Sequence, residues 1–180
     1  NKFALAQLLE GELDSPFEAI ELYQEILEEN HNFSEAIRAL EGIRRDLAGR
    51  EGEWAHMRQT TIELLLKYYE EERNWQRIDD LLEELTALVD DPQEQVDLLI
   101  KKARRLLKAS DDSTEKVQAL TNLAQAYCLD PTNEEVSQLI EALANDLDAW
   151  KRVVPIYLHA LGESDDVDRQ GHILAAIAQI

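Results

Sequence analysis

Residues 119–131, ALTNLAQAYCLDP, decide the fold. Ala119, Leu123 and Ala126 follow one another by four and three positions, which places them on one face of a helix. Asp130-Pro131 then gives a turn signal. The same pattern returns 34 residues later at Val153, Tyr157, Ala160 and Asp165. A repeat of this length is typical of helical repeat proteins, in which each unit is a pair of antiparallel helices.

Further copies of the pattern lie nearer the N-terminus. The segment that begins at Trp75 aligns with the one that begins at Trp150, and residues 19–31 keep the same internal spacing at Ala19, Tyr23, Ile26 and His31. Helix pairing explains this spacing. A small or β-branched residue lets two helices approach closely, and the bulky residues one and two turns later fill the remaining space.

Helix starts are also visible, because Ser15-Pro16-Phe17-Glu18, Asp91-Pro92-Gln93-Glu94 and Thr132-Asn133-Glu134-Glu135 carry capping signals. The 6 Gly and 4 Pro are too few for a many-stranded protein. Short loops of two to five residues predict antiparallel neighbours. We therefore predict an all-α chain with helices at 1–12, 16–29, 33–48, 52–72, 75–89, 92–109, 113–128, 133–146, 150–162 and 166–180.

The segment from Ala126 to Pro131 resembles the end of the second helix of a tetratricopeptide (TPR) repeat. Ile62, Leu65, Leu66 and Tyr69, followed by Trp75, Ile78 and Leu82, resemble one whole degenerate unit. The resemblance covers most of the chain, although Leu or Glu often replaces the small residue of the first helix. It implies an α-solenoid of about five TPR-like helix pairs in a single domain over residues 1–180. In this family the first helices line a concave groove that binds peptides.

One interval departs from the repeat length. The matched residues Trp54 and Ile78 are only 24 positions apart. Either a turn near 59–61 is lost, which fuses two helices into one long helix over 52–72, or the β-branched pair Thr60-Thr61 breaks that helix. The two alternatives are equally supported by the sequence.

The charge balance limits the class of partner. The 38 acidic and 18 basic residues give a net charge of −20, which repels nucleic acid and anionic membrane surfaces. The longest apolar run, residues 173–178, is too short to cross a membrane. The single Cys128 excludes an internal disulfide and is compatible with any compartment; a cytoplasmic location is favoured. Because Asn1 is not an initiator Met, we expect the chain to be a fragment of a longer repeat protein.

Candidate catalytic groups are sparse. Two Glu-x-x-His steps, Glu28–His31 and Glu53–His56, have the spacing that di-iron bundles use, which keeps a helical metal-carboxylate enzyme open as a remote alternative. Cys128 is expected to be a buried, inert thiol, and Trp75, Trp150 and Tyr157 to wedge adjacent helices. With no phosphate loop or nucleophile motif, we predict no enzymatic activity and no cofactor.

One helix carries an unusual concentration of positive charge. Lys101, Arg104, Arg105 and Lys108 fall on one stripe, separate from the apolar stripe of the same helix. The resemblance places this helix first in its pair, facing the groove. We predict that the stripe binds a partner, flanked by Lys67 on the preceding first helix and by Gln138 and Asn145 on the following one. The alternative is a solvated face braced by ion pairs.

The sequence thus favours a non-catalytic scaffold that binds a peptide or a partner helix on a concave groove. The expected partner is a protein or peptide, with no nucleic acid and no membrane insertion. The alternative is a structural segment that stacks on further repeats or self-associates through exposed terminal repeats.

Overall fold

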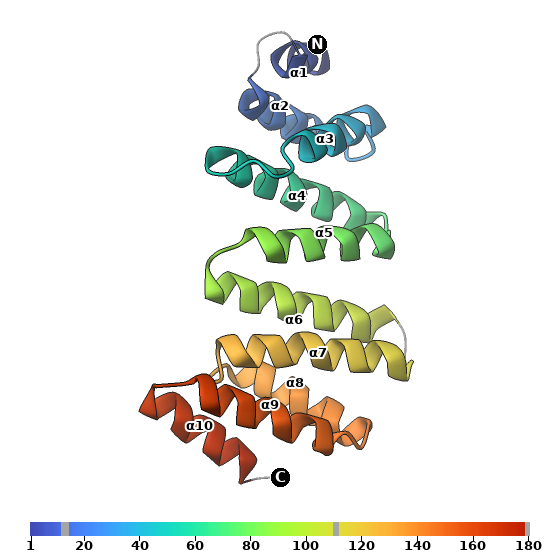
Figure 1. Ribbon diagram of the computed structural model, residues 1–180. Coiled ribbons are helices and arrows are strands. Elements are labelled where there is room, and N and C mark those ends of the chain that lie inside the picture. The colour runs from blue at the N-terminus through green and yellow to red at the C-terminus, as the bar shows by residue number, and fades with distance from the viewer. Residues whose placement is uncertain (12–14, 110–111, 179–180) are drawn as a thin grey trace. The chain divides into compact units, whose positions relative to one another are not determined.

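The structure, a computed structural model, describes residues 1–11, 15–109 and 112–178. The described residues form helices and no strands (Figure 1). The fold is therefore all-α, as predicted. The ten helices are α1 (Lys2–Gly11), α2 (Pro16–Glu29), α3 (Ser34–Asp46), α4 (Glu53–Glu71), α5 (Trp75–Leu88), α6 (Pro92–Ala109), α7 (Ser113–Leu129), α8 (Glu134–Asp146), α9 (Trp150–Glu163) and α10 (Val167–Ile177).

The helix bounds agree with the predicted ones to within two residues, except that the predicted ends at Glu12 and Ile180 lie outside the described residues. Polar side chains fix several starts. Asp91 Oδ1 accepts from the Gln93 amide at 2.9 Å. Asn133 Oδ1 accepts from the Val136 amide at 3.1 Å, so Asn133 and not Thr132 caps α8. The capping box at Ser15 is wrong, since its side chain forms no cap hydrogen bond, although Pro16 does open α2.

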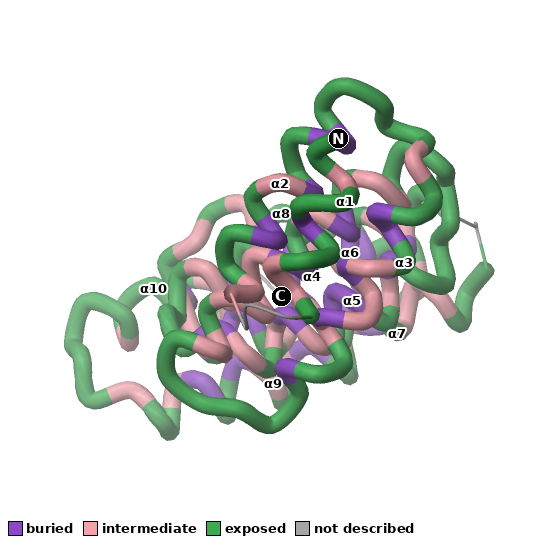
Figure 2. Tube along the Cα trace, turned by 90° about the horizontal axis from the view of Figure 1, so that it is seen from above, coloured by how far each residue is buried: buried purple, intermediate pink, exposed green. Residues whose placement is uncertain are grey.

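The helices divide into two compact units. The first, Asn1–Leu88, contains α1 to α5. Consecutive helices pack against each other, and α2 also contacts α4. In α2 to α5, buried positions recur every one to four residues along one face of each helix, whereas Ala6 is the buried position given for α1 (purple in Figure 2). The largest fully buried side chains of this unit are Tyr23, Leu40, Ile62, Leu65, Ile78, Leu81 and Leu82.

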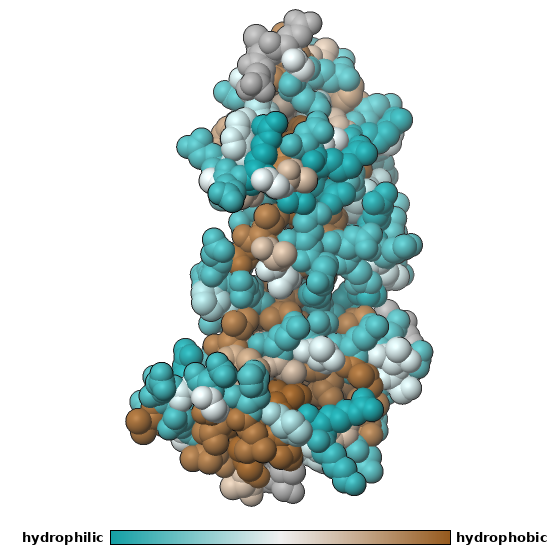
Figure 3. Space-filling model, in the orientation of Figure 1, coloured by the Kyte–Doolittle hydropathy of each residue, from teal (hydrophilic) through white to brown (hydrophobic). Residues whose placement is uncertain are grey.

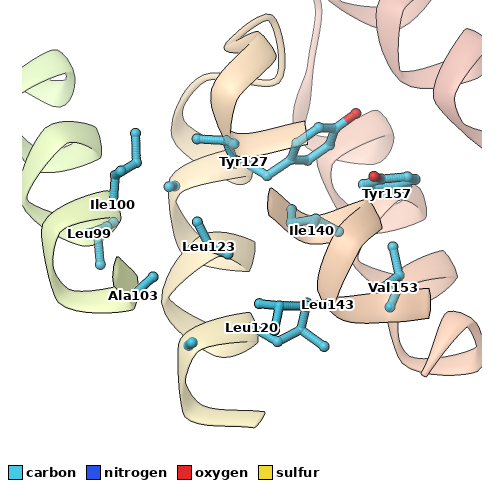
Figure 4. Packing of buried hydrophobic residues seen from close by; sticks show 14 of the residues in the cluster. Leu99, Ile100, Ala103, Leu120, Leu123, Tyr127, Ile140, Leu143, Val153 and Tyr157 are labelled. Atoms are coloured by element: carbon cyan, nitrogen blue, oxygen red, sulfur yellow. The ribbon is translucent and has the colours of Figure 1, made fainter. Parts of the chain in front are cut away.

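The second unit, Val89–Ile180, contains α6 to α10. Helix α7 is central, because α6, α8 and α9 all pack against it. Figure 4 shows how the apolar side chains of α6, α7, α8 and α9 meet in one cluster. The 34-residue spacing seen in the sequence has a direct counterpart here: the matched residues Ala119, Leu123, Ala126, Val153, Tyr157 and Ala160 are all buried.

Helix α4 is continuous from Glu53 to Glu71, which decides between the two alternatives for this segment. The Thr60 hydroxyl donates to the His56 carbonyl at 3.1 Å, and the Thr61 hydroxyl donates to the Met57 carbonyl at 2.7 Å. These bonds to the preceding turn satisfy both hydroxyls within the helix. The fused long helix is therefore correct, and the break at Thr60-Thr61 is wrong.

The aromatic residues do not all behave as expected. Tyr157 is buried and Trp150 is half-buried, but Trp75 is 45% exposed, so its predicted wedging role is wrong. Both tryptophans begin a helix. The Trp150 indole N–H donates to Asn145 Oδ1 at 2.9 Å, which holds the ring against its own unit. Among the described residues, Trp75 has no corresponding acceptor.

None of the helices in the described part of the chain has the length and apolar character that a membrane span requires.

Candidate partner-binding surface on α6 and α8

The basic stripe lies on the outer side of α6. Leu99, Ala103 and Leu106 bury the inner side of this helix against the second unit's core. Lys101, Arg104 and Lys108 are exposed, whereas Arg105 is half-buried. The separation of the basic stripe from the apolar one is therefore confirmed, with Arg105 at the boundary between them.

An ion pair connects this stripe to α8. Arg104 Nη2 lies 2.7 Å from Glu135 Oε1, and the two side chains are 57% and 43% exposed. A pair this exposed contributes at most about 1 kcal/mol to stability. Its importance is geometric: the two helices that come first in their predicted pairs present side chains to one shared surface.

Gln138 and Asn145 extend this surface along α8. They follow Glu135 by three and ten positions, which places all three on one helix face, and both are exposed. Asn145 already accepts the hydrogen bond from Trp150 that fixes the start of α9. We refer to Lys101, Arg104, Lys108, Glu135, Gln138 and Asn145 as the α6–α8 surface.

Two of the seven predicted site residues are not among those that form this surface. Lys67 is exposed on α4, in the first unit. The half-buried Arg105 belongs to the edge of the core. The structure places Lys101, Arg104 and Lys108 on one exposed stripe of α6, and Gln138 and Asn145 on the exposed face of α8 that also carries Glu135.

A second cationic group on the same unit was not predicted. Lys151 and Arg152, at the start of α9, are exposed. With Ser113, Thr114 and Val117 of α7 they line an open hollow of about 650 Å³. Lys151 and Arg152 are only two adjacent cations, and nothing in the sequence separates them from other charged surface residues.

Cys128 differs from the prediction in its exposure. The residue is exposed, not buried. Partial desolvation of the thiol, together with the negative charge of Glu163, raises the Cys128 pKa above its usual value. The protonated thiol is a poor nucleophile. The prediction of a buried residue is wrong, and the raised pKa gives the thiol low reactivity.

The two Glu-x-x-His steps do not assemble further ligands. His31 lies in the turn after α2, where Nδ1 is 4.0 Å from Glu71 of α4. Over residues 1–11, 15–109 and 112–178, no group of three or more His, Cys, Asp or Glu is placed to hold a metal ion.

The first unit contains a half-buried polar cluster that sequence reasoning missed. Glu84 of α5 contacts Arg44 of α3 and, at 2.7 Å, Arg58 of α4. Arg44 also lies 2.8 Å from Glu41, and Glu41 accepts from the Tyr69 hydroxyl at 3.0 Å. We call these five residues the Glu84 cluster. Its four charged side chains are only 15–18% exposed.

The electrostatics of the Glu84 cluster are shaped by burial. Desolvation alone would lower the pKa of the Arg44 guanidinium, but Glu41 and Glu84 raise it above its usual value. Desolvation and the charge of Glu41 raise the pKa of Tyr69 to about 12. The only local signal in the sequence was the three-residue spacing of Glu41 and Arg44; the other contacts join three different helices.

Comparison of the chain with protein-family models, curated proteins and solved structures finds no match.

Proposed function

We propose that this chain is a non-catalytic scaffold of degenerate TPR-like repeats, and that the α6–α8 surface binds a peptide or a partner helix. The 34-residue correspondence between α7 and α9 supports a repeat, because the matched positions are apolar in sequence and buried in the structure. In this register α6 and α8 are the first helices of consecutive pairs, which in the TPR family face the groove.

The observation that carries the proposal is the Arg104–Glu135 ion pair. It brings a cation from α6 and a carboxylate from α8 together on one surface, with Lys101 and Lys108 exposed beside them. A planar guanidinium can bind a carboxylate through two parallel hydrogen bonds, whereas the lysines act as point charges. The fitting partner is therefore a peptide or helix that presents a carboxylate group.

The existing ion pair is compatible with binding. Because the pair is exposed, its loss costs at most about 1 kcal/mol. A carboxylate of the partner can replace Glu135 at Arg104 and gain contacts with Lys101 and Lys108. Glu135 then repels a partner whose acidic groups are misplaced, which adds selectivity for position.

The test compares two charge-reversal variants of the full chain. In Lys101→Glu/Arg104→Glu the α6–α8 surface loses two of its three cations, while Lys108 and the half-buried Arg105 are left intact. The matched control, Lys151→Glu/Arg152→Glu, makes the same change in net charge at the start of α9. The probe is a set of acidic peptides immobilised on beads, used first to recover binders to the wild-type chain.

We expect the first variant to weaken binding by at least ~2 kcal/mol if the contacts are partly buried, and the control to bind nearly as well as wild type. Circular dichroism should show equal helicity for all three proteins. If wild type and Lys101→Glu/Arg104→Glu bind with equal affinity, the basic stripe is a solvated face and not a binding site. Equal loss in both variants would show that net charge alone is responsible.

The alternative, a structural segment that stacks on further repeats or self-associates, is favoured by a different observation. Leu174 on the last helix is 54% exposed. The exposed apolar position Leu174 is not part of the α6–α8 surface, which is mainly charged and polar.

A further inference from the structure

The first turns of α4 pack less deeply than the rest of that helix. The buried residues of α4 are Thr61, Ile62, Leu65 and Leu66. Residues 53–60 are all described and contain none; we call them the α4 strap. Hydrophilic side chains (teal) predominate over α4 on the side that Figure 3 shows. Because little apolar surface is fully removed from water along the α4 strap, the hydrophobic effect stabilises it less than the rest of the helix.

The α4 strap also packs incompletely against α2. His56 and Met57 of the α4 strap and Phe17 of α2 line an open hollow of about 510 Å³. Phe17 is 49% exposed. A gap of this kind lacks the contacts that a close-packed interface between two helices supplies. The α4 strap is therefore held weakly on this side.

Both ends of the α4 strap have features of a hinge. Before it, Gly49 and Gly52 have positive φ angles of 74° and 66°, which glycine adopts at little cost. At its other end, the Thr60 and Thr61 hydroxyls donate to carbonyls of the preceding turn. Such bonds slightly destabilise a helix and often bend it, and β-branched residues lower helix propensity. Local opening would therefore separate the α4 strap from the rest of α4 at these threonines.

The Glu84 cluster connects the α4 strap to its neighbours. Arg58 of the α4 strap lies 2.7 Å from Glu84 of α5, and Glu84 also contacts Arg44 of α3. Arg58 and Glu84 are each 18% exposed, so solvent screens their attraction less than it screens an exposed pair. Without Glu84, the Arg58 charge would stay half-buried and unpaired unless the α4 strap opened and returned the guanidinium to water.

We propose that the α4 strap opens as a local unit and that the contact between Arg58 and Glu84 is the latch that keeps it closed. The closed helix is continuous, and the open form is a minor state of the same segment. Opening exposes the half-buried Trp54 and Met57. The inference does not depend on the α6–α8 surface, which belongs to the second unit.

Amide hydrogen exchange of the full chain, measured on overlapping peptides at several low urea concentrations, tests the latch. Glu84→Ala removes the carboxylate. Arg58→Met removes only the cation of the α4 strap and leaves Glu84 paired with Arg44. The matched control, Glu35→Ala, removes one carboxylate from the exposed pair with Arg38 on α3. Circular dichroism checks that all the variants are folded.

In wild type we expect the amides of residues 57–60 to exchange at least ~10-fold faster than those of residues 62–70. Low urea should speed the second group but change the first by less than ~2-fold, because a local opening exposes little surface. Glu84→Ala and Arg58→Met should each speed exchange of residues 57–60 by at least ~5-fold. Glu35→Ala should leave these rates within ~2-fold of wild type.

Two results would overturn the inference. If residues 57–60 and 62–70 exchange in wild type at the same rate and with the same dependence on urea, the α4 strap opens only together with the rest of its unit. If residues 57–60 open locally but neither Glu84→Ala nor Arg58→Met speeds their exchange beyond that in Glu35→Ala, the contact between Arg58 and Glu84 is not the latch.

Discussion

The rings of Tyr127 and Tyr157 lie with their centroids 4.6 Å apart at an interplanar angle of 32°, in the core of the second unit. Both side chains are buried, and neither hydroxyl has a hydrogen-bond partner among the described residues. In the first unit, the Tyr23 hydroxyl instead donates to Glu10 at 2.8 Å. The three buried tyrosines therefore differ in the contribution of their hydroxyls to stability.

Removal of these hydroxyls should separate the two cases. Replacing an unpartnered buried hydroxyl by hydrogen costs little, whereas removing a hydrogen-bonded one costs about 0.5–1.5 kcal/mol. We expect Tyr127→Phe and Tyr157→Phe to leave the free energy of unfolding unchanged or slightly higher, and Tyr23→Phe to lower it. Urea denaturation of the three variants measures this. A loss above ~1.5 kcal/mol in Tyr157→Phe would contradict the assignment.

Alkaline pH should destabilise the chain through its buried tyrosines. Desolvation and the negative charge of Glu141 raise the pKa of Tyr157 to about 12, and that of Tyr127 is raised mainly by desolvation. A folded-state pKa above the unfolded value of 10.0 favours the neutral form. The contribution to stability is therefore complete below about pH 10 and is lost as the pH rises through about 12.

Spectrophotometric titration of tyrosinate, with the folded and the urea-unfolded chain compared, measures this shift. Compared with the folded wild type, folded Tyr157→Phe should show one fewer tyrosine ionising near pH 12. Titration of every tyrosine near pH 10 in the folded protein would contradict the burial of these side chains.

The Glu84 cluster should stabilise the first unit as a set. Glu84→Ala leaves Arg44 and Arg58 half-buried without the carboxylate that they share, so we expect a loss of about 1–3 kcal/mol. The comparison is Glu35→Ala, which breaks the exposed pair with Arg38 at 3.9 Å and should cost less than ~0.5 kcal/mol. Chemical denaturation gives both values, and similar losses would mean that the Glu84 cluster is no more than a surface network.

Two apolar positions of the second unit should differ in their sensitivity to truncation. Ile140→Ala removes a fully buried side chain and should cost about 2–5 kcal/mol. Leu174→Ala truncates a side chain of α10 that is 54% exposed and should cost less than ~1.5 kcal/mol. Thermal or urea unfolding of the two variants tests this difference in burial. Equal losses would mean that Leu174 is covered in solution.

Local signals were sufficient for the helices of this chain. Pro16, Asp91-Pro92 and the apolar spacings fixed the starts and the inward faces, because a helix forms from contacts three and four residues apart. The 34-residue correspondence of Ala119 with Val153 also predicted which positions are buried. The continuity of α4 was left open, since Thr60 and Thr61 lower helix propensity but can also bond to the preceding turn.

The candidate site was only partly accessible to the same reasoning. Spacing along α6 placed Lys101, Arg104 and Lys108 outside the core, but nothing local indicated that Arg104 meets Glu135 of α8. The exposure of Cys128 and Trp75 was likewise mispredicted. The apolar spacing of a helix predicts which side of it faces a neighbouring helix. How much of that side is buried depends on the length and position of the neighbouring helix.

The sequence by itself therefore determined the all-α class, the helix bounds and the repeat spacing, because all three follow from short-range backbone and side-chain periodicity. The tertiary structure alone decided which charges meet. Glu84 joins Arg44 and Arg58 from two other helices, and Arg104 joins Glu135. It also decided that Ile140 of α8 and Ile173 of α10 are both fully buried, whereas the neighbouring Leu174 is exposed. Burial and ion pairing depend on the residues that packing brings near. The spacing of residues along one helix does not specify those neighbours.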